Sequence, residues 1–353
     1  MKRLLAIGLL VVALLSCSAV ASPRSLLPFD PEWTVTQVHD LIAAGAKVNA
    51  RDDDGWTPLM HAAKYSCSLE VVIELLNAGA KVSARNALGG TALMEAAAFN
   101  ANPEAIRALI DAGSDVNARD QFQGTPLMRA AANSPNPETI RVLIAAGADV
   151  NERTDSGLTP LLHAAEHSEN PDVIRALVLA GAEVNIRDSD GLTPLMRAAE
   201  SNPNYKAVQH LVAAGADVNE KTDSGLTSLM YAVRKNPNLG VVEAIIAAGA
   251  DVNAQDKEDC TPLMHAARNA TPAIIETLIS VGADINVQDK SGMTPLMHAA
   301  AGTRNPKVIE ILLISGADAK LRSYAGKTAF DYPLGNKSVT GTDAYWLLND
   351  ARF

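Results

Sequence analysis

The stretch that decides the fold is DSDGLTPLMRAA at residues 188–199, because similar segments recur along most of the chain. Its threonine recurs with a spacing of 34 residues, and once of 33, at Thr57, Thr91, Thr125, Thr159, Thr193, Thr227, Thr261, Thr294 and Thr328. A glycine keeps the same phase from Gly45 to Gly316. A fixed period of this length is typical of a solenoid of repeated units.

Each unit is expected to contain two helices. Thr125 followed by Pro126 predicts a helix start, since the Thr oxygen caps a free N–H and Pro tolerates the first helical position. Asn102 predicts the start of a second helix, and Gly113 its end, because glycine adopts the left-handed conformation there. Such a helix pair carries apolar stripes on both sides and must pack against its neighbours. The sequence therefore predicts an all-α repeat solenoid.

With its continuation GADVN at 215–219, the unit resembles an ankyrin repeat. The resemblance covers about residues 35 to 330 and implies a stack of antiparallel helix pairs with β-hairpin loops on one side. It also implies that the chain acts by binding another protein. We expect an N-terminal half-unit at 35–51, eight full units at 52–322 and a C-terminal cap at 323–353, closed by Tyr345, Trp346 and Leu347.

Two departures from the family pattern predict local differences. The family usually has His after Thr-Pro-Leu, where this chain has methionines such as Met60 and Met196, so we expect apolar packing to replace a polar network. Gln123 and Asp259 stand where other units have the turn glycine. Because Gln tolerates a positive φ poorly, we expect strain near Gln123.

The N-terminus predicts export. Lys2 and Arg3 precede an apolar run from Leu4 to Leu15, so residues 1–21 are expected to be a secretory signal peptide and residues 22–34 a linker. Cleavage after Ala21 and acylation at Cys17, in a lipobox-like context, are both open. The protein is thus expected in the periplasm or outside an exporting bacterial cell, or as an outer-membrane lipoprotein. No other apolar run approaches the ~18 residues of a membrane span.

Composition and motifs argue against several function classes. Forty acidic against thirty basic residues leave a net charge of −10, which is unfavourable for nucleic-acid binding. The sequence holds no phosphate-binding glycine loop, C-x-x-C pair or G-x-S-x-G elbow, so no enzyme, metal or cofactor is predicted. Cys67 and Cys260 lie too many units apart to form a disulfide, and Cys260 is expected to face solvent.

Two alternatives to a binding scaffold stay open. His163, Glu166 and His167 match H-x-x-E-H, and histidines four residues apart share a helix face, as a zinc-dependent hydrolase requires. No third ligand is evident. The second alternative is a secreted effector that acts on host proteins.

We predict that the partner binds the concave face and the hairpin tips. The candidates are the variable residues before each Thr and along each first helix: Trp56, His61, Tyr65, Phe99, Arg129, Leu158, His163, His167, Leu192, Arg197, Leu226, Tyr231, Arg234, His265, Arg268 and His298. An exposed strip is expected from Leu158 through Leu192 to Leu226. The groove should bind a protein segment with apolar anchors and acidic character, more tightly at lower pH as the histidines charge.

Overall fold

A computed structural model describes residues 25–65, 68–100, 102–269, 271–333 and 336–351. Within these ranges the regular structure is helical and no residue is assigned to a strand. The expected signal peptide, which contains the acylation candidate Cys17, and a second cysteine, Cys67, lie outside the described residues. No helix in the described part of the chain has the length and apolar character needed to cross a bilayer.

The first helices of the units form an inner row. Each begins after its threonine, whose Oγ1 accepts a hydrogen bond from the backbone N–H three residues later, as Thr193 does from Met196 at 3.3 Å. The row consists of α2 (Pro58–Lys64), α4 (Ala92–Phe99), α6 (Pro126–Asn133), α8 (Pro160–His167), α10 (Pro194–Ser201), α12 (Ser228–Lys235), α14 (Pro262–Asn269) and α16 (Pro295–Gly302).

The second helices form an outer row that packs against the first. Asn102 caps α5 by accepting from the N–H of Glu104, and Gly113 follows the helix with φ 92°. The row consists of α1 (Val35–Ala43), α3 (Leu69–Asn77), α5 (Pro103–Asp111), α7 (Pro137–Ala145), α9 (Pro171–Leu179), α11 (Tyr205–Ala213), α13 (Leu239–Ala247), α15 (Pro272–Ser280) and α17 (Lys307–Ile314).

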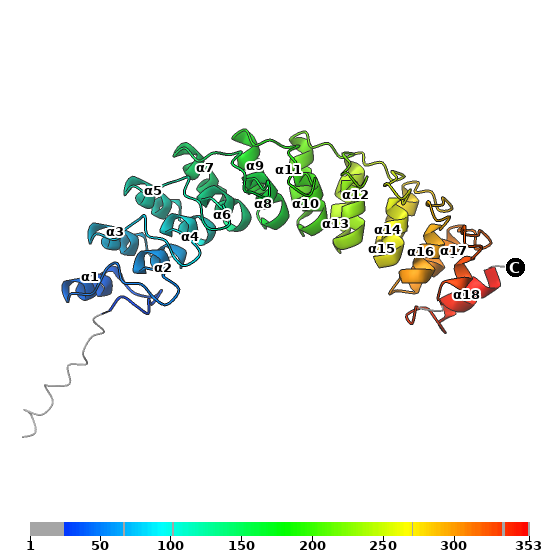
Figure 1. The fold of residues 1–353 in the computed structure, drawn as a ribbon, viewed down its shortest axis with the longest axis horizontal. Coiled ribbons are helices and arrows are strands. Elements are labelled where there is room, and N and C mark those ends of the chain that lie inside the picture. Colours follow the sequence, from blue (N-terminus) through cyan, green and yellow to red (C-terminus); the bar gives the residue numbers. More distant parts are fainter. Residues whose placement is uncertain (1–24, 66–67, 101, 270, 334–335, 352–353) are drawn as a thin grey trace, which may run out of the picture.

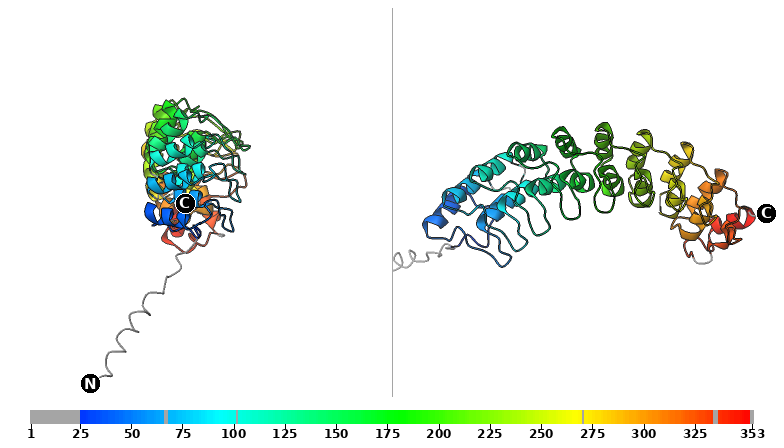
Figure 2. Two further views of the ribbon diagram at one scale, coloured as in Figure 1. Left: turned by 90° about the vertical axis from the view of Figure 1, so that its left-hand side faces the viewer. Right: turned by 45° about the horizontal axis from the view of Figure 1, so that its top comes forward.

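The two rows bend into an arch. Figure 1 shows the array as an arch, in which α5, α7 and α9 lie on the convex side of α4, α6 and α8. Seen along the array, the helices occupy one side and the loops project to the other (Figure 2). Small residues such as Ala198 and Ala199 are fully buried between inner helices, which lets these helices approach closely, whereas the outer row buries longer residues such as Ile174 and Leu177. The closer inner row accounts for the curvature.

The expected β-hairpins are tight turns. In the turn of residues 188–192, the N–H of Asp188 donates to the carbonyl of Leu192 at 3.1 Å, and the N–H of Ser189 donates to Ser156 of the preceding turn at 3.0 Å. The same kind of bond joins several other turns to the preceding one, as from Gln121 N–H to the carbonyl of Leu88 at 3.1 Å. Gln123 and Asp259 adopt φ values of 64° and 57°, so the left-handed backbone expected at Gln123 is present.

Buried asparagines after several inner helices add a link between units that the sequence reasoning missed. Asn202 is fully buried, and its Nδ2 donates to the carbonyls of Ala165 and Ser168 in the preceding unit at 3.0 and 3.1 Å. Asn236 repeats these bonds to Ala199 and Asn202. These asparagines therefore satisfy carbonyls of the neighbouring repeat.

Both ends of the array differ from expectation. The described part of the expected linker packs onto the first repeat, with Leu26 fully buried, so it is not a free linker. At the other end, after the short 3-10 helix η1 (Ala329–Asp331), the cap helix α18 (Asp343–Ala351) buries Ala344 and Leu348. The expectation that Trp346 and Leu347 close this end is wrong, since these side chains are 57% and 44% exposed.

Candidate protein-binding surface

The predicted cations of the inner helices are joined to the preceding turn by a contact that spans nine residues. Arg129 Nη2 lies 2.6 Å from Asp120 Oδ2, and Arg197 Nη2 lies 2.7 Å from Asp188 Oδ2. His61, His265 and His298 make the same contact, at 2.8 Å, to Asp52, Asp256 and Asp289 respectively. The methionines are buried as expected. A polar contact to the turn is made instead by the residue that follows five of them. The positive charges of Arg129 and Arg197 are therefore already compensated by a carboxylate of the chain itself.

Three of the predicted histidines have a lowered pKa, which works against the expectation that they charge on acidification. Burial and the neighbouring His167 lower the pKa of His163 to about 4. Burial lowers the pKa of His265, although Asp256 favours its protonated form. Burial and the charge of Arg268 lower the pKa of His298, which is 3% exposed and is therefore a core residue rather than a partner contact.

A cluster of aromatic side chains surrounds Lys64 near the N-terminal end. Lys64 Nζ lies 4.9 Å from the ring centre of Trp56, 5.4 Å from Tyr65 and 5.3 Å from Phe99. His61 stacks on Tyr65, with ring centres 6.2 Å apart. Four predicted site residues are thus brought together by cation–π and stacking contacts, with Tyr65 and Phe99 about half exposed.

A hollow that holds several predicted site residues lies between three successive turns and the helices α6 and α8. This cavity of about 650 Å³ is lined by the predicted residues Arg129, Leu158, His163 and His167, and by Leu88 and Phe122, which the sequence reasoning missed. Leu88 is 50% exposed and Phe122 64% exposed. We call the surface formed by these six residues the α6–α8 groove. Leu88 and Phe122 could have been found from the sequence, because each is a large apolar residue at the tip of a turn, where there is no core to pack against.

A second hollow adjoins the α6–α8 groove. It measures about 400 Å³, has Ala132, Asn133 and His167 in common with the lining of the first hollow, and reaches Phe99. The first hollow is lined by turn residues such as Phe122 and the second by residues of inner helices such as Phe99, and the two hollows share three lining residues. The sequence placed Phe99, Arg129, Leu158, His163 and His167 on one face, and the structure brings these five onto one continuous depression.

The expected leucine strip is not continuous. Leu192 is 6% exposed and packs in the core, while Leu158 and Leu226 are half-buried on either side of it. Leu192 is therefore removed from the exposed surface. Tyr231 is half-buried against the core and Arg234 is exposed on the same helix, α12. These residues lie two units beyond α8 and do not line the groove.

The H-x-x-E-H residues do not form a converging set of ligand atoms in the described structure. The rings of His163 and His167 are 6.4 Å apart, centre to centre. Glu166 lies 3.8 Å from the Arg197 guanidinium, and also 3.8 Å from His167 Nε2. The group of metal-ligand side chains that does converge among the described residues is Cys260, Asp289 and His298.

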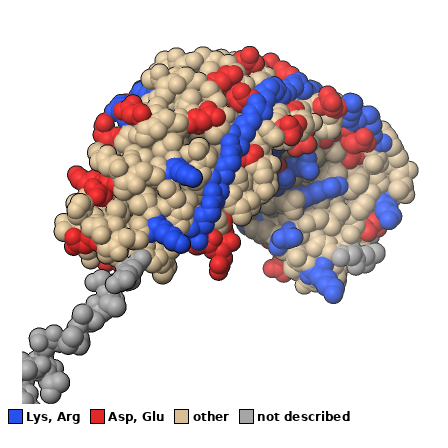
Figure 3. Space-filling model, turned by 60° about the vertical axis from the view of Figure 1, so that its left-hand side comes forward, with Lys and Arg blue, Asp and Glu red and all other residues tan. Residues whose placement is uncertain are grey.

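A row of basic residues at 34-residue spacing was also missed. Arg51 donates to the carbonyl of Arg85 at 2.6 Å, Arg85 to that of Arg119 at 2.6 Å, and Arg153 to that of Arg187 at 2.8 Å. Arg187 and Lys221 continue the pattern. Figure 3 shows a continuous band of basic side chains of this kind. Because each of these side chains donates a hydrogen bond to a backbone carbonyl of the next repeat, the row connects the units to one another.

The family of the chain follows from these repeats and from comparison with known proteins. The model of ankyrin repeats matches residues 34–120, 93–188, 127–222, 163–256 and 229–323, so the chain belongs to the ankyrin repeat family. The solved structure of the human ASB11 ankyrin repeat domain is similar, with a TM-score of 0.56 and 26% sequence identity, over 65% of this chain and 98% of that one. None of the curated proteins compared with the chain is a match. Ankyrin repeats generally act as protein–protein interaction modules.

Proposed function

We propose that this chain is a non-enzymatic scaffold that binds a protein partner in the α6–α8 groove on its concave side. The observation that carries the proposal is the exposure of Leu88 and Phe122 at the rim of a hollow of about 650 Å³. Large apolar side chains at the edge of a concavity supply most of the binding energy when a partner covers them.

The groove favours a partner with apolar anchors rather than an acidic one. Arg129 is already paired with the buried carboxylate of Asp120, and His163 is uncharged because burial holds its pKa at about 4. An acidic segment would therefore find little free positive charge in the groove. Apolar side chains of the partner would instead cover Leu88, Phe122 and Leu158 and exclude water from them.

Capture experiments with matched variants test this proposal. Phe122→Ser and Leu88→Ser remove apolar surface from the groove, whereas Leu179→Ser and Ile314→Ser remove it from outer helices, where these side chains are 79% and 83% exposed. We expect crosslinked partner recovered from the exporting cell to fall at least tenfold for the groove variants and to stay unchanged for the outer-helix variants. Equal recovery from all four would exclude the groove.

Export is part of the proposal and is supported by the sequence of residues 1–21. Two processing products differ in a measurable way. Cleavage after Ala21 gives a mature chain beginning at Ser22, while lipoprotein processing gives an acylated Cys17. Fractionation and intact-mass measurement of the wild type and of Cys17→Ser distinguish them, because only the lipoprotein leaves the membrane fraction when Cys17 is replaced. A chain that keeps Met1 and stays in the cytoplasm would refute export.

A further inference from the structure

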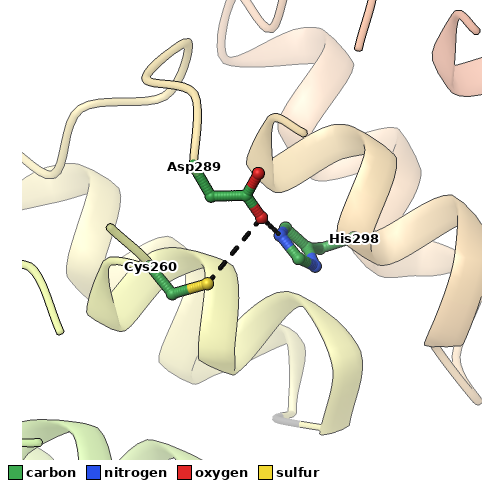
Figure 4. A group of neighbouring side chains, drawn as sticks. All are labelled: Cys260, Asp289 and His298. Atoms are coloured by element: carbon green, nitrogen blue, oxygen red, sulfur yellow. Dashed lines mark hydrogen bonds and ion pairs between the residues drawn. The ribbon is translucent and has the colours of Figure 1, made fainter. Parts of the chain in front are cut away.

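Three side chains of the kinds that bind metals converge between the last two full repeats. Cys260 lies before α14, Asp289 lies in the next turn, and His298 lies on α16. Their ligand atoms all lie within 4.8 Å of one another. Figure 4 shows the thiol and the imidazole approaching one carboxylate oxygen, Asp289 Oδ2, which is 3.8 Å from Cys260 Sγ and 2.8 Å from His298 Nε2.

The carboxylate at the centre of this cluster is held in place. Asp289 Oδ1 accepts hydrogen bonds from the backbone N–H groups of Ser291 and Met293, each at 2.8 Å. Asp289 and His298 are buried, and Cys260 is half-buried rather than facing solvent. Oδ2 is therefore presented at a fixed position to the other two side chains, as the outer contacts of metal sites do for their ligands.

The repeats themselves provide a comparison. The same His–Asp pair occurs one unit earlier, where His265 Nε2 lies 2.8 Å from Asp256 Oδ2. The residue in the place of Cys260 is there Leu226, 34 residues earlier. The His–Asp pair thus recurs in the array, whereas the Cys260 thiol is present only beside Asp289 and His298 and adds a third ligand to this pair.

We propose that Cys260, Asp289 and His298 bind one zinc ion, which links the turns of two adjacent repeats and leaves one coordination position for water or a partner side chain. Sulfur, imidazole nitrogen and carboxylate oxygen are the donors that zinc takes in tetrahedral sites. Calcium and magnesium take oxygen donors and are disfavoured by the thiolate and the imidazole. This site lies outside the α6–α8 groove and does not rest on the proposed partner binding.

Arg268 competes with the metal. Its Nε donates to His298 Nδ1 at 3.0 Å, so Nδ1 acts as the acceptor and the proton of the neutral ring lies on Nε2, facing Asp289. Zinc bound at Nε2 requires this proton to move to Nδ1, and the guanidinium must then withdraw. Arg268 is exposed and has room to do so. Removal of its positive charge also removes a repulsion from the ion.

The proton balance follows from these bonds. The Cys260 thiol loses its proton to the buffer as the Zn–S bond forms, His298 keeps one proton that changes nitrogen, and Asp289 stays ionised. One proton is therefore released for each zinc ion bound. Burial raises the pKa of the Cys260 thiol to about 12 in the metal-free chain, so zinc displaces a proton that is otherwise held at neutral pH.

Cobalt titration of the mature full-length protein tests the site, because a cobalt–thiolate bond gives a charge-transfer absorption that zinc then abolishes. We expect one equivalent of cobalt in the wild type, no such band in Cys260→Ser or His298→Ala, and an unchanged band in Cys67→Ser. His265→Ala is the matched control, since it removes the same kind of His–Asp pair without the thiol, and it should bind as the wild type does.

Arg268→Gln provides a test that misfolding cannot imitate. We expect this exposed substitution to tighten zinc binding roughly tenfold, because it removes the competing hydrogen bond and charge. A wild type that binds no stoichiometric cobalt, a band that survives Cys260→Ser, or an affinity that Arg268→Gln leaves unchanged would each overturn the proposal.

Discussion

The carboxylate of Asp188 joins Arg197 to the turn of its own repeat. The guanidinium Nε and Nη2 lie 2.8 and 2.7 Å from Asp188 Oδ2, while Oδ1 accepts the backbone N–H groups of Asp190 and Leu192, each at 2.9 Å. The carboxylate is almost fully buried. One side chain thus fixes the turn and joins it to helix α10.

Replacing Asp188 by Ala should therefore destabilise the array. The substitution leaves the half-buried Arg197 without its main partner and leaves two turn N–H groups unsatisfied, for which we expect a loss of about 3 kcal/mol in the free energy of unfolding. The measurement is urea denaturation followed by circular dichroism.

Asp190→Ala is the matched control, since Asp190 Oδ2 also lies 3.2 Å from Arg197 but its side chain is 72% exposed. Exposed ion pairs contribute little, so this variant should lose no more than about 0.5 kcal/mol. Similar losses for the two variants would show that the turn does not depend on the buried carboxylate.

The turn at Gln123 should be stabilised by glycine. Gln123 has φ 64°, a left-handed conformation that costs an L residue about 1–2 kcal/mol and costs glycine nothing. Glycine also has more freedom in the unfolded chain, which offsets part of this gain. We therefore expect Gln123→Gly to stabilise the protein by about 1 kcal/mol in urea denaturation.

The opposite substitution checks the same reasoning. Gly157 has φ 75°, and a Cβ there would lie 3.2 Å from the backbone nitrogen of Ser189. Gly157→Ala should therefore destabilise the protein. If Gln123→Gly lowered stability as well, the bond that Gln123 accepts from Arg119 would outweigh the backbone strain.

The repeat period was enough to predict the helices, their caps and their stacking, because each of these depends on residues close in sequence. The site was predicted less well. Exposure was inferred from each residue's position in the repeat, and the contacts that bury a side chain in a particular unit cannot be seen from that position. Leu192 and His298 occupy register positions that are half-buried in most other units, yet they pack inside. A signal was present: Asp stands nine residues before His61, Arg129 and Arg197, whereas Thr154 precedes His163.

That difference at His163 predicts a pH dependence of stability. His163 has no Asp nine residues before it, and burial, His167, Arg129 and Arg197 lower its pKa from 6.5 to about 4, although Asp120 acts in the opposite sense. Between these two values the unfolded chain binds the proton and the folded chain does not. Stability should therefore fall as the pH falls from 6.5 to about 4, with a contribution of about 1.4 kcal/mol per pH unit.

His163→Gln isolates this contribution from that of other groups. Glu95, whose pKa burial raises, contributes with the opposite sign but is present in both proteins and cancels in the comparison. In urea denaturation at several pH values, the wild type should lose stability relative to His163→Gln below pH 6.5. A difference that stays constant down to pH 4.5 would mean that His163 is not held neutral.

The stability of the C-terminal end should depend on Leu348 rather than on the exposed residues beside it. Leu348 is fully buried and Leu347 is 44% exposed on the same helix, α18. Leu348→Ala removes core contacts worth about 2–5 kcal/mol, whereas Leu347→Ala should cost less than about 0.5 kcal/mol. Because units in a repeat array contact only their neighbours, the loss at Leu348 should appear as faster hydrogen exchange confined to α17 and α18, with the exchange of α8 unchanged. Uniformly faster exchange along the whole chain would instead mean that the array unfolds as one cooperative body and that its end helix supports every repeat.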